Sequence, residues 1–357
     1  MNHFAEIRAR LERWGLDAML LTGEANRFYA SGFHSSGTDG AALVTKEKNY
    51  YWTDSRYIEA AEAQVRDAEL VLATSGRGYT DLLKEAADRH GLTVVGFEDE
   101  YMTVSDWRRY ERKTGLTFKA ATGLLTELRM VKSPEELESL TAAQRIAERA
   151  LAEIYNDIRP GVTEKEIAAR LTYLMLREGA ENLSFDPIVA SGANGSKPHA
   201  VPTAKPLAEG EFVTMDFGCI VGGYCSDMTR TVALGSVTEE MERVYQTVLD
   251  AQAAGIAVAR AGVPGCDVHN AAARVIADAG YGAYFGHGFG HGVGVEIHEA
   301  PRASTTWTKP LPAGAVISAE PGIYLPGRFG VRIEDVIVIR DGGCKNLHRA
   351  PKSLRIL

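Results

Sequence analysis

The sequence has little cysteine and no long apolar run. Its four cysteines among 357 residues form no CxxC pair, which excludes a zinc knuckle and a thioredoxin-type redox pair. No segment approaches the about 20 apolar residues that span a bilayer. Residues 1–14 read as an amphipathic helix and lack the apolar core of a signal peptide. These absences predict a cytoplasmic protein whose cysteines are small buried residues.

The chain also lacks an excess of basic residues. Its formal net charge is -8, which argues against a nucleic-acid partner and against an anionic membrane surface. Hydrophobic residues make up 45% and charged residues 24%, as in ordinary globular proteins, so no long disordered segment is expected. The length suits two domains better than one.

Residues 1–130 alternate strand and helix signals. Apolar runs at 17–22, 69–73, 93–97 and 116–120 read as strands, and Ala41–Thr45 followed by Asn49–Thr53 reads as a hairpin. Asp54 is expected to cap a helix that runs to about Val65. Strands separated by helices of this length predict a small α/β domain with a partly parallel sheet.

A domain boundary is expected near residue 130. Ser133-Pro134-Glu135-Glu136 has the pattern of a helix start, with serine at the cap, proline at the first position and glutamate three residues after the serine. A second capped helix begins at Thr163. Beyond residue 186 strand-like runs dominate, interrupted by helices at 239–260 and 265–279. Residues 131–357 are therefore expected to form a second domain with a mainly antiparallel sheet, and the whole chain an α+β protein.

Two aspartates stand in an apolar hairpin, Val213–Val232. If the turn is Ile220–Gly223 and the strands pair symmetrically about its centre, Asp216 lies directly opposite Asp227. Facing residues of an antiparallel pair have Cβ atoms about 4.5–5.5 Å apart. Two carboxylates at that distance in apolar surroundings require a proton, a basic residue or a cation.

The segment Ser318–Val336 repeats this arrangement with glutamates. Its expected turn is Pro326-Gly327-Arg328, and symmetry about Gly327 places Glu320 opposite Glu334. One acidic residue in a strand is more often structural than functional. Two such pairs, at mirrored positions of two apolar hairpins, favour a metal site.

A glycine-rich segment, Gly286–Glu299, lies between the hairpins and holds His287, His291 and His298. Glycine lets the backbone come close to a bound group, and an imidazole adds the nitrogen ligand that the four carboxylates lack. Such a mixed set suits Mn, Co, Fe or Zn better than Ca or Mg, and it fits two cations about 3.5–4 Å apart. A further histidine, His199, ends a Gly/Asn/Pro loop that can reach into a cleft.

Several motifs occur in a fixed order along the chain: DFG followed by SDMTRT, HGFGHGVG followed by IHE, then AEPGIY and VRIED. With these motifs the chain resembles the creatinase/aminopeptidase superfamily of the pita-bread fold, and within it Xaa-Pro dipeptidase (prolidase) and aminopeptidase P. The resemblance covers nearly the whole chain. It implies a creatinase-type N-terminal domain, a pita-bread catalytic domain and a homodimer.

The resemblance also implies roles for the residues that match the motifs. Five of them are implied metal ligands: Asp216, Asp227, His291, Glu320 and Glu334. Others are implied to line the substrate site or to shape the cleft and support the ligands: His199, His287, His298, Arg332, Tyr324 and Thr229. All five ligand positions are filled, which counts against a relative that has lost its metals.

The implied activity is hydrolysis of the bond between an N-terminal residue and proline, with two divalent ions such as Mn, Co or Zn. The ions lower the pKa of water and polarise the carbonyl. Glu320 is implied to carry the proton, and His298 and His199 to steady the oxyanion or the departing nitrogen. An aminopeptidase P that accepts longer peptides is the alternative, and a catalytically inactive pita-bread binding module is the alternative of another class.

Overall fold

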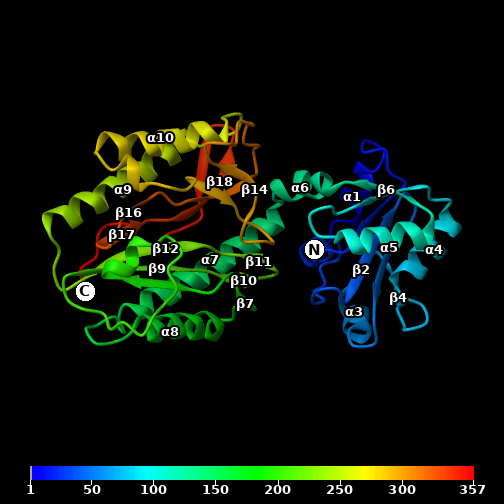
Figure 1. Ribbon diagram of the computed structural model, residues 1–357, viewed down its shortest axis with the longest axis horizontal. Coiled ribbons are helices and arrows are strands. Elements are labelled where there is room, and N and C mark those ends of the chain that lie inside the picture. The colour runs from blue at the N-terminus through cyan, green and yellow to red at the C-terminus, as the bar shows by residue number, and fades with distance from the viewer. Residues whose placement is uncertain (1) are drawn as a thin grey trace. The chain divides into compact units, whose positions relative to one another are not determined.

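The computed structural model of the protein describes residues 2–357 (Figure 1). The chain folds as two compact units, Met1–Arg129 and Met130–Leu357. Among the described residues, no helix is both long and apolar enough to cross a bilayer. All four cysteines are free, and Cys219 and Cys225 are buried.

The first unit is built on one six-stranded sheet with the order β4-β3-β2-β1-β5-β6. Strands β1, β5 and β6 are parallel, β2 joins β1 to β3 in antiparallel fashion, and β4 is parallel to β3. The predicted partly parallel sheet and the hairpin are thus confirmed. The strands are β1 (Ala18–Leu21), β2 (Gly40–Thr45), β3 (Asn49–Thr53), β4 (Glu69–Leu72), β5 (Val94–Phe97) and β6 (Thr117–Ala120).

Six helices accompany this sheet: α1 (Phe4–Arg10), α2 (Glu24–Ser31), α3 (Ile58–Gln64), α4 (Tyr79–His90), α5 (Val104–Thr114) and α6 (Thr122–Met130). Helices α2 and α6 were not predicted. The expected cap of α3 is wrong, because the helix begins at Ile58 with Tyr57 at its N-cap. Asp54 instead accepts a hydrogen bond from the backbone N–H of Arg56 at 2.9 Å. Asp54 therefore caps a turn over residues 54–57 that precedes the helix, since its carbonyl also accepts from the N–H groups of Tyr57 and Ile58 at 3.1 Å.

The second unit has two halves, each a pair of helices packed on antiparallel strands. Helices α7 (Pro134–Ile154) and α8 (Glu164–Arg177) share one apolar core with the first half of the strands. Helices α9 (Glu239–Val258) and α10 (Gly265–Asp278) share another with the second half. Figure 1 shows these strands between α9 and α10 on one side and α8 on the other. The predicted helix start is confirmed, since the Ser133 side chain accepts from Glu136 N–H and the Glu136 carboxylate accepts from Ser133 N–H.

Thirteen short strands and the breaks and loops between them hold the candidate site residues. The first half has β7 (Asn182–Leu183), β8 (Ile188–Ser191), β9 (Glu211–Phe217), β10 (Cys219–Val221), β11 (Tyr224–Cys225) and β12 (Met228–Leu234). The second half has β13 (Gly290–Gly292), β14 (Glu299–Ala303), β15 (Val316–Ala319), β16 (Gly322–Leu325), β17 (Phe329–Arg332), β18 (Asp335–Arg340) and β19 (Gly343–Asn346). Their sheets are ordered β12-β9-β8, β11-β10-β7, β14-β13-β15-β18-β19 and β16-β17.

The predicted register of the first hairpin is wrong. Asp216 pairs with Thr229, not with Asp227. The turn is centred on Gly222 and Gly223, which have φ of 57° and 75°, and the type I′ turn that twisted hairpins favour requires positive φ at both central residues. Asp227 lies two residues before Thr229, so it stays on the same face of the pleat as Asp216.

The predicted register of the second hairpin is confirmed. Strands β16 and β17 pair Gly322 with Arg332, and β15 and β18 pair Ala319 with Asp335. The two strand pairs continue the same register. In that register Glu320, between β15 and β16, lies opposite Glu334, between β17 and β18. Both glutamates therefore stand where the hairpin passes from one sheet to the other.

Candidate metal centre

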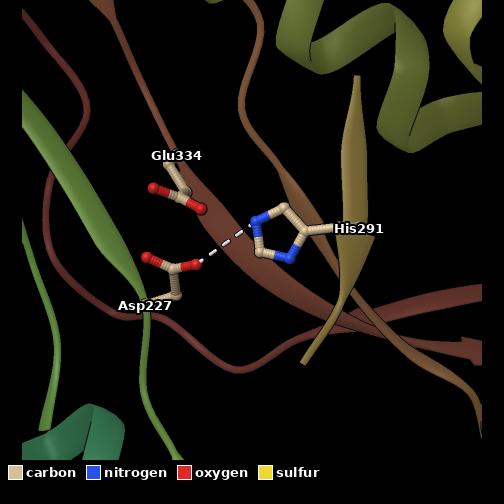
Figure 2. Close-up of side chains that lie close together, drawn as sticks. All are labelled: Asp227, His291 and Glu334. Carbon is tan, nitrogen blue, oxygen red and sulfur yellow. Dashed lines mark ion pairs between the residues drawn. The ribbon is translucent and has the colours of Figure 1, made fainter. Parts of the chain in front are cut away.

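The structure brings the five predicted ligand residues together around one cavity of about 550 Å³ in the second unit. Asp216 lies on β9, His291 lies on β13, and the other three stand in the short breaks beside β12, β15 and β18. Single ligand atoms of Asp227, His291 and Glu334 lie within 4.8 Å of one another. Figure 2 shows the three side chains pointing toward a common centre.

Backbone hydrogen bonds fix the strands that carry these residues. The N–H of Glu320 donates to the carbonyl of Phe289 at 2.8 Å, which ties the second hairpin to the glycine-rich segment. The N–H of Glu334 donates to the carbonyl of Thr229 at 3.1 Å, which ties it to the first hairpin. Three segments far apart in the sequence thus meet through their main chains.

A glycine permits the closest of these approaches. A Cβ at position 290 would lie 1.9 Å from the carbonyl oxygen of Ser318, so β13 can lie against β15 only with glycine there. In contrast, a Cβ at Gly286 would have no atom within 4 Å. Within the glycine-rich segment, position 290 is therefore a packing requirement next to His291, and position 286 is not.

The centre holds more negative charge than its protein surroundings compensate. Asp216, Asp227, Glu320 and Glu334 face one guanidinium, that of Arg332, whose Nη2 donates to Asp216 Oδ2 at 2.6 Å. Burial raises the pKa of Asp227 well above its ordinary value, and the charges of Glu334, Asp216 and Glu320 raise it further. Burial and the charges of Glu320 and Asp216 do the same to the pKa of Glu334.

Glu320 and His291 form an ion pair within this cluster. Burial opposes ionisation of Glu320, but the hydrogen bond and charge of His291 lower its pKa to about 2. Burial would lower the pKa of His291, yet Glu320 raises it. His291 Nε2 lies 3.0 Å from Glu320 Oε1 and 3.6 Å from Asp227 Oδ2. The His291 ring therefore occupies part of the position that a cation would take among these carboxylates.

The orientation of His291 suits a metal ligand. Its Nδ1 lies 3.1 Å from the carbonyl oxygen of Gly292. A carbonyl only accepts, so Nδ1 carries the proton and Nε2 is the nitrogen that faces Asp227 and Glu320. Histidines that bind metals commonly donate their second N–H to a carbonyl in this way.

Within residues 2–357, two buried oxygens of the centre have no hydrogen-bond partner. They are Asp216 Oδ1 and Glu334 Oε1, while the second oxygen of Glu334 accepts from Thr229 Oγ1 at 2.7 Å. Buried carboxylate oxygens normally have a partner. Unpartnered oxygens, mutually repelling carboxylates and a pre-oriented imidazole together form a donor set that divalent cations fit.

A chain of hydrogen bonds supports the centre from one side. Arg332 Nη1 donates to Tyr324 Oη at 2.9 Å, and Tyr324 Oη lies 3.0 Å from His287 Nε2. His287 Nδ1 donates to the carbonyl of Gly288 at 2.8 Å. Both nitrogens of His287 are therefore engaged by the protein, so this predicted substrate-site residue lines the cavity as a fixed group.

The other two predicted histidines are exposed on the cavity wall. The ring of His298 lies 4.3 Å from that of His291, edge to face. Partial burial of its ring, followed by the charge of His291, lowers the pKa of His298, so this imidazole is neutral at neutral pH. His199 lines the same cavity from its loop between β8 and β9.

One cationic residue of the cavity wall, Arg302, was missed in the sequence. It is exposed, it lines the cavity, and on β14 it pairs directly with His291 of β13. Facing residues of an antiparallel pair project to the same side, so the guanidinium stands beside the candidate metal centre. Within residues 2–357 its side chain has no ion pair. Only the register between β13 and β14 identifies it, and the sequence alone does not reveal that register.

Comparisons with known families divide the chain in two. Residues 4–131 match the creatinase/prolidase N-terminal domain, and residues 138–341 match metallopeptidase family M24. The chain is 39% identical over 339 residues to the Xaa-Pro dipeptidase of Pyrococcus furiosus, covering 95% of each chain.

Solved structures resemble the protein over its whole length. A Bacillus anthracis Xaa-Pro dipeptidase is 38% identical with a TM-score of 0.94 and 99% of each chain covered. An X-Pro aminopeptidase from Thermotoga maritima is 36% identical with a TM-score of 0.94 and 100% of each chain covered. The two relatives carry different activity names at nearly equal similarity, so the comparison alone does not separate the two specificities.

Proposed function

This chain belongs to metallopeptidase family M24, with a creatinase-type N-terminal domain before a pita-bread catalytic domain, and from that premise we propose that it is a two-metal Xaa-Pro dipeptidase. One observation carries the proposal. A buried cluster of four carboxylates and one imidazole shares a cavity wall with Arg302, an exposed and unpaired cation. The catalytic domain of this proposal comprises residues 131–357.

The proposed ligands are the five residues of the cluster: Asp216, Asp227, His291, Glu320 and Glu334. Among these four carboxylates only Asp216 bonds a guanidinium, that of Arg332, so the cluster keeps an excess of acidic groups that two divalent cations offset. The donor set admits Mn, Co or Zn. When bound, the ions lower the pKa of water and polarise the scissile carbonyl.

The protein's own groups move the proton and steady the charge. Glu320 stands in the cluster with its carboxylate beside His291 Nε2. We assign to this carboxylate the proton of the attacking water, which it takes and returns to the leaving nitrogen. Neutral His298, exposed in the cavity, offers an N–H to the oxygen on which negative charge develops. We assign His199 to the leaving-group side of the cavity.

Proline explains the need for a dedicated site. Its amide nitrogen carries no hydrogen and its ring fixes φ, so a peptidase that binds an extended backbone through that N–H does not hold it. The cavity wall here also includes half-buried apolar side chains, Phe185, Ile188 and Ile297. These can pack against a pyrrolidine ring without using its nitrogen.

Arg302 favours a dipeptide over a longer substrate. A dipeptide has a free carboxylate on its second residue, whereas a longer peptide has a neutral amide there. A guanidinium binds a carboxylate through charge-assisted hydrogen bonds. An exposed, unpaired guanidinium on the cavity wall therefore gives Xaa-Pro dipeptides an interaction that longer peptides lack.

The substitution Arg302→Ala tests this assignment. A hydrogen bond to a charged group contributes about 1.5–3 kcal/mol, so kcat/KM for Ala-Pro is expected to fall roughly 10- to 100-fold. Cleavage of Ala-Pro-Ala-Ala, measured as released alanine, should stay within about 2-fold of its value in the unsubstituted chain, since no charge-assisted bond of this size is lost.

The control for this test is Arg340→Ala, which removes an exposed cation of the same sheet that does not line the cavity. It should leave both substrates unaffected. Equal losses on both substrates in Arg302→Ala would contradict recognition of the terminal carboxylate and move the activity toward an aminopeptidase P. The homodimer implied by the resemblance and the cytoplasmic location predicted from the sequence stay predictions.

A further inference from the structure

A buried carboxylate holds both ends of the loop that carries His199. This loop, residues 191–203, is called the histidine loop below. Glu164, the first residue of α8, is 0% exposed and accepts five hydrogen bonds from the loop. The two ends that it joins are far apart along the loop but meet at this one side chain.

The five bonds are divided between the two carboxylate oxygens. Oε1 accepts from the N–H and the hydroxyl of Ser191 at 2.7 and 2.9 Å. Oε2 accepts from the N–H and the hydroxyl of Thr203 at 2.9 and 2.7 Å and from the amide of Asn194 at 3.0 Å. One oxygen thus fixes the start of the histidine loop, and the other fixes its end.

This carboxylate has no cationic partner within residues 2–357. Lys205, which follows the loop, donates to Ser191 Oγ and to Glu211 instead. A buried charge without an opposite charge is costly unless hydrogen bonds replace its hydration. The five donors of the histidine loop replace the water that would otherwise solvate the Glu164 carboxylate. The carboxylate can therefore be buried only with the loop in this conformation, and the loop keeps this conformation through the carboxylate.

His199 has no anchor of its own. Its imidazole is exposed in the cavity and makes no hydrogen bond or ion pair within residues 2–357. Its neighbour Pro198 accepts from Arg332 Nη1 at 3.2 Å, and the loop lies against β17, where a Cβ at Gly330 would be 2.1 Å from the Gly195 carbonyl oxygen. The place of the imidazole is therefore set by the backbone of the histidine loop.

We propose that Glu164 is a positioning residue that acts on the reaction only through His199, by holding the two ends of the histidine loop together. The inference rests on the proposed function for the part played by His199. Glu164 is remote from the reacting atoms, since it does not line the cavity. Its effect is thus predicted to vanish when His199 is absent.

Glu164→Gln is the variant of choice, because it keeps the shape of the side chain. The amide has one acceptor oxygen, and its NH₂ group cannot accept from a backbone N–H. Either Ser191 N–H or Thr203 N–H then loses its partner, and one end of the loop loses part of its attachment to α8. Glu166→Gln is the matched control, since Glu166 stands in the same turn of α8 and bonds only the Thr163 cap.

The first measurement is amide hydrogen exchange with mass spectrometry, and it does not depend on activity. Peptides that cover residues 191–203 are expected to exchange faster in Glu164→Gln than in the unsubstituted chain and in Glu166→Gln. Metal content, measured by inductively coupled plasma mass spectrometry, should be the same in all three. Unchanged exchange in the histidine loop would overturn the inference, whatever the activity.

The second measurement is a kinetic cycle with His199→Ala on Ala-Pro. Because a misplacement of 1 Å can cost about 10²-fold, Glu164→Gln is expected to lower kcat roughly 10- to 100-fold in the unsubstituted background. In the His199→Ala background it should lower kcat less than about 2-fold, since residues that act as a unit are not additive. A full multiplicative loss in both backgrounds overturns the inference.

Two further outcomes separate this inference from the proposed function. If His199→Ala keeps full kcat, the assigned role of His199 fails, and the exchange experiment still decides whether Glu164 holds the loop. If Glu164→Gln does not fold, Thr203→Val with Asn194→Ala replaces it, because these changes remove two side-chain donors and leave both backbone N–H donors in place. The same cycle then applies, with smaller but still non-additive losses expected.

Discussion

Asp227→Asn is expected to abolish both divalent-metal binding and turnover while making the metal-free protein more stable at neutral pH. The asparagine keeps the shape of the side chain but removes one of four mutually repelling carboxylates. Its neutral amide is also a poorer ligand for a hard cation than a carboxylate. A substitution that abolishes activity is thus expected to increase the stability of the metal-free protein.

The pH dependence follows from the direction of the pKa shift. Folding raises the pKa of Asp227 well above its ordinary value, chiefly by burial and by the charge of Glu334. Above the unfolded value of about 3.9 the folded state therefore binds more protons than the unfolded state. Stability of the metal-free protein falls as pH rises from there through the folded pKa. Asparagine at this position removes that fall.

Thermal unfolding with and without manganese at pH 5 and pH 8 measures both effects. Ligand at 100 times its Kd stabilises a protein by about 2.7 kcal/mol, which corresponds to a rise in Tm of roughly 5–10 °C in a domain of this size. Asp227→Asn should lose that rise. Asp186→Asn, which removes an exposed carboxylate of the same cavity, should keep it. A full manganese shift in Asp227→Asn would contradict the assigned ligand set.

His298→Ala is expected to lower kcat by about 10²- to 10³-fold, the usual effect of removing one donor to a developing oxyanion. His298 is exposed in the cavity with its ring 4.3 Å from that of His291. Its pKa is lowered by burial and by His291, so at neutral pH it holds one N–H to donate. Metal content should stay full, because His298 is outside the proposed ligand set.

His298→Asn provides the control, since it restores a hydrogen-bond donor without an imidazole. It should recover part of the lost kcat with KM little changed. Steady-state kinetics on Ala-Pro, together with metal analysis of each variant, make this comparison. If alanine at this position instead lowers metal content in step with activity, His298 supports the metal centre and has no part in stabilising the transition state.

The two acidic hairpins show when the register of a hairpin can be predicted from the symmetry of its sequence about the turn. The turn at Pro326–Arg328 has a single central residue, Gly327, so its register follows from symmetry alone and the structure agrees. In the first hairpin the turn can be centred on Val221–Gly222 or on Gly222–Gly223. The structure has Gly222–Gly223 at the centre, because both of these residues take positive φ. The error moved the partner of Asp216 by two residues. A register shift of two residues leaves each side chain on the same face of the strand pair, so the two aspartates still lie on one face.

Other parts of the site lay outside what one sequence reveals. Arg302 joins the cavity through a strand pairing with His291 that contains an irregularity, and no local pattern predicts it. Glu164 reads as an ordinary acid in the first turn of a helix. Its five donors come from a loop about 30 residues later, and only the tertiary structure brings them to it. Family resemblance gave the ligand set, since spacing alone gave only pairs of acids.

Hydrolysis of Ala-Pro and Ala-Pro-Ala-Ala by protein stripped with a chelator and then reloaded with Mn, Co or Zn is the most direct test of the account. The account predicts no cleavage by the stripped protein and, after reloading, release of alanine and proline from Ala-Pro in preference to the tetrapeptide. Undiminished cleavage by the stripped protein, or no cleavage of Ala-Pro by the reloaded one, would contradict it.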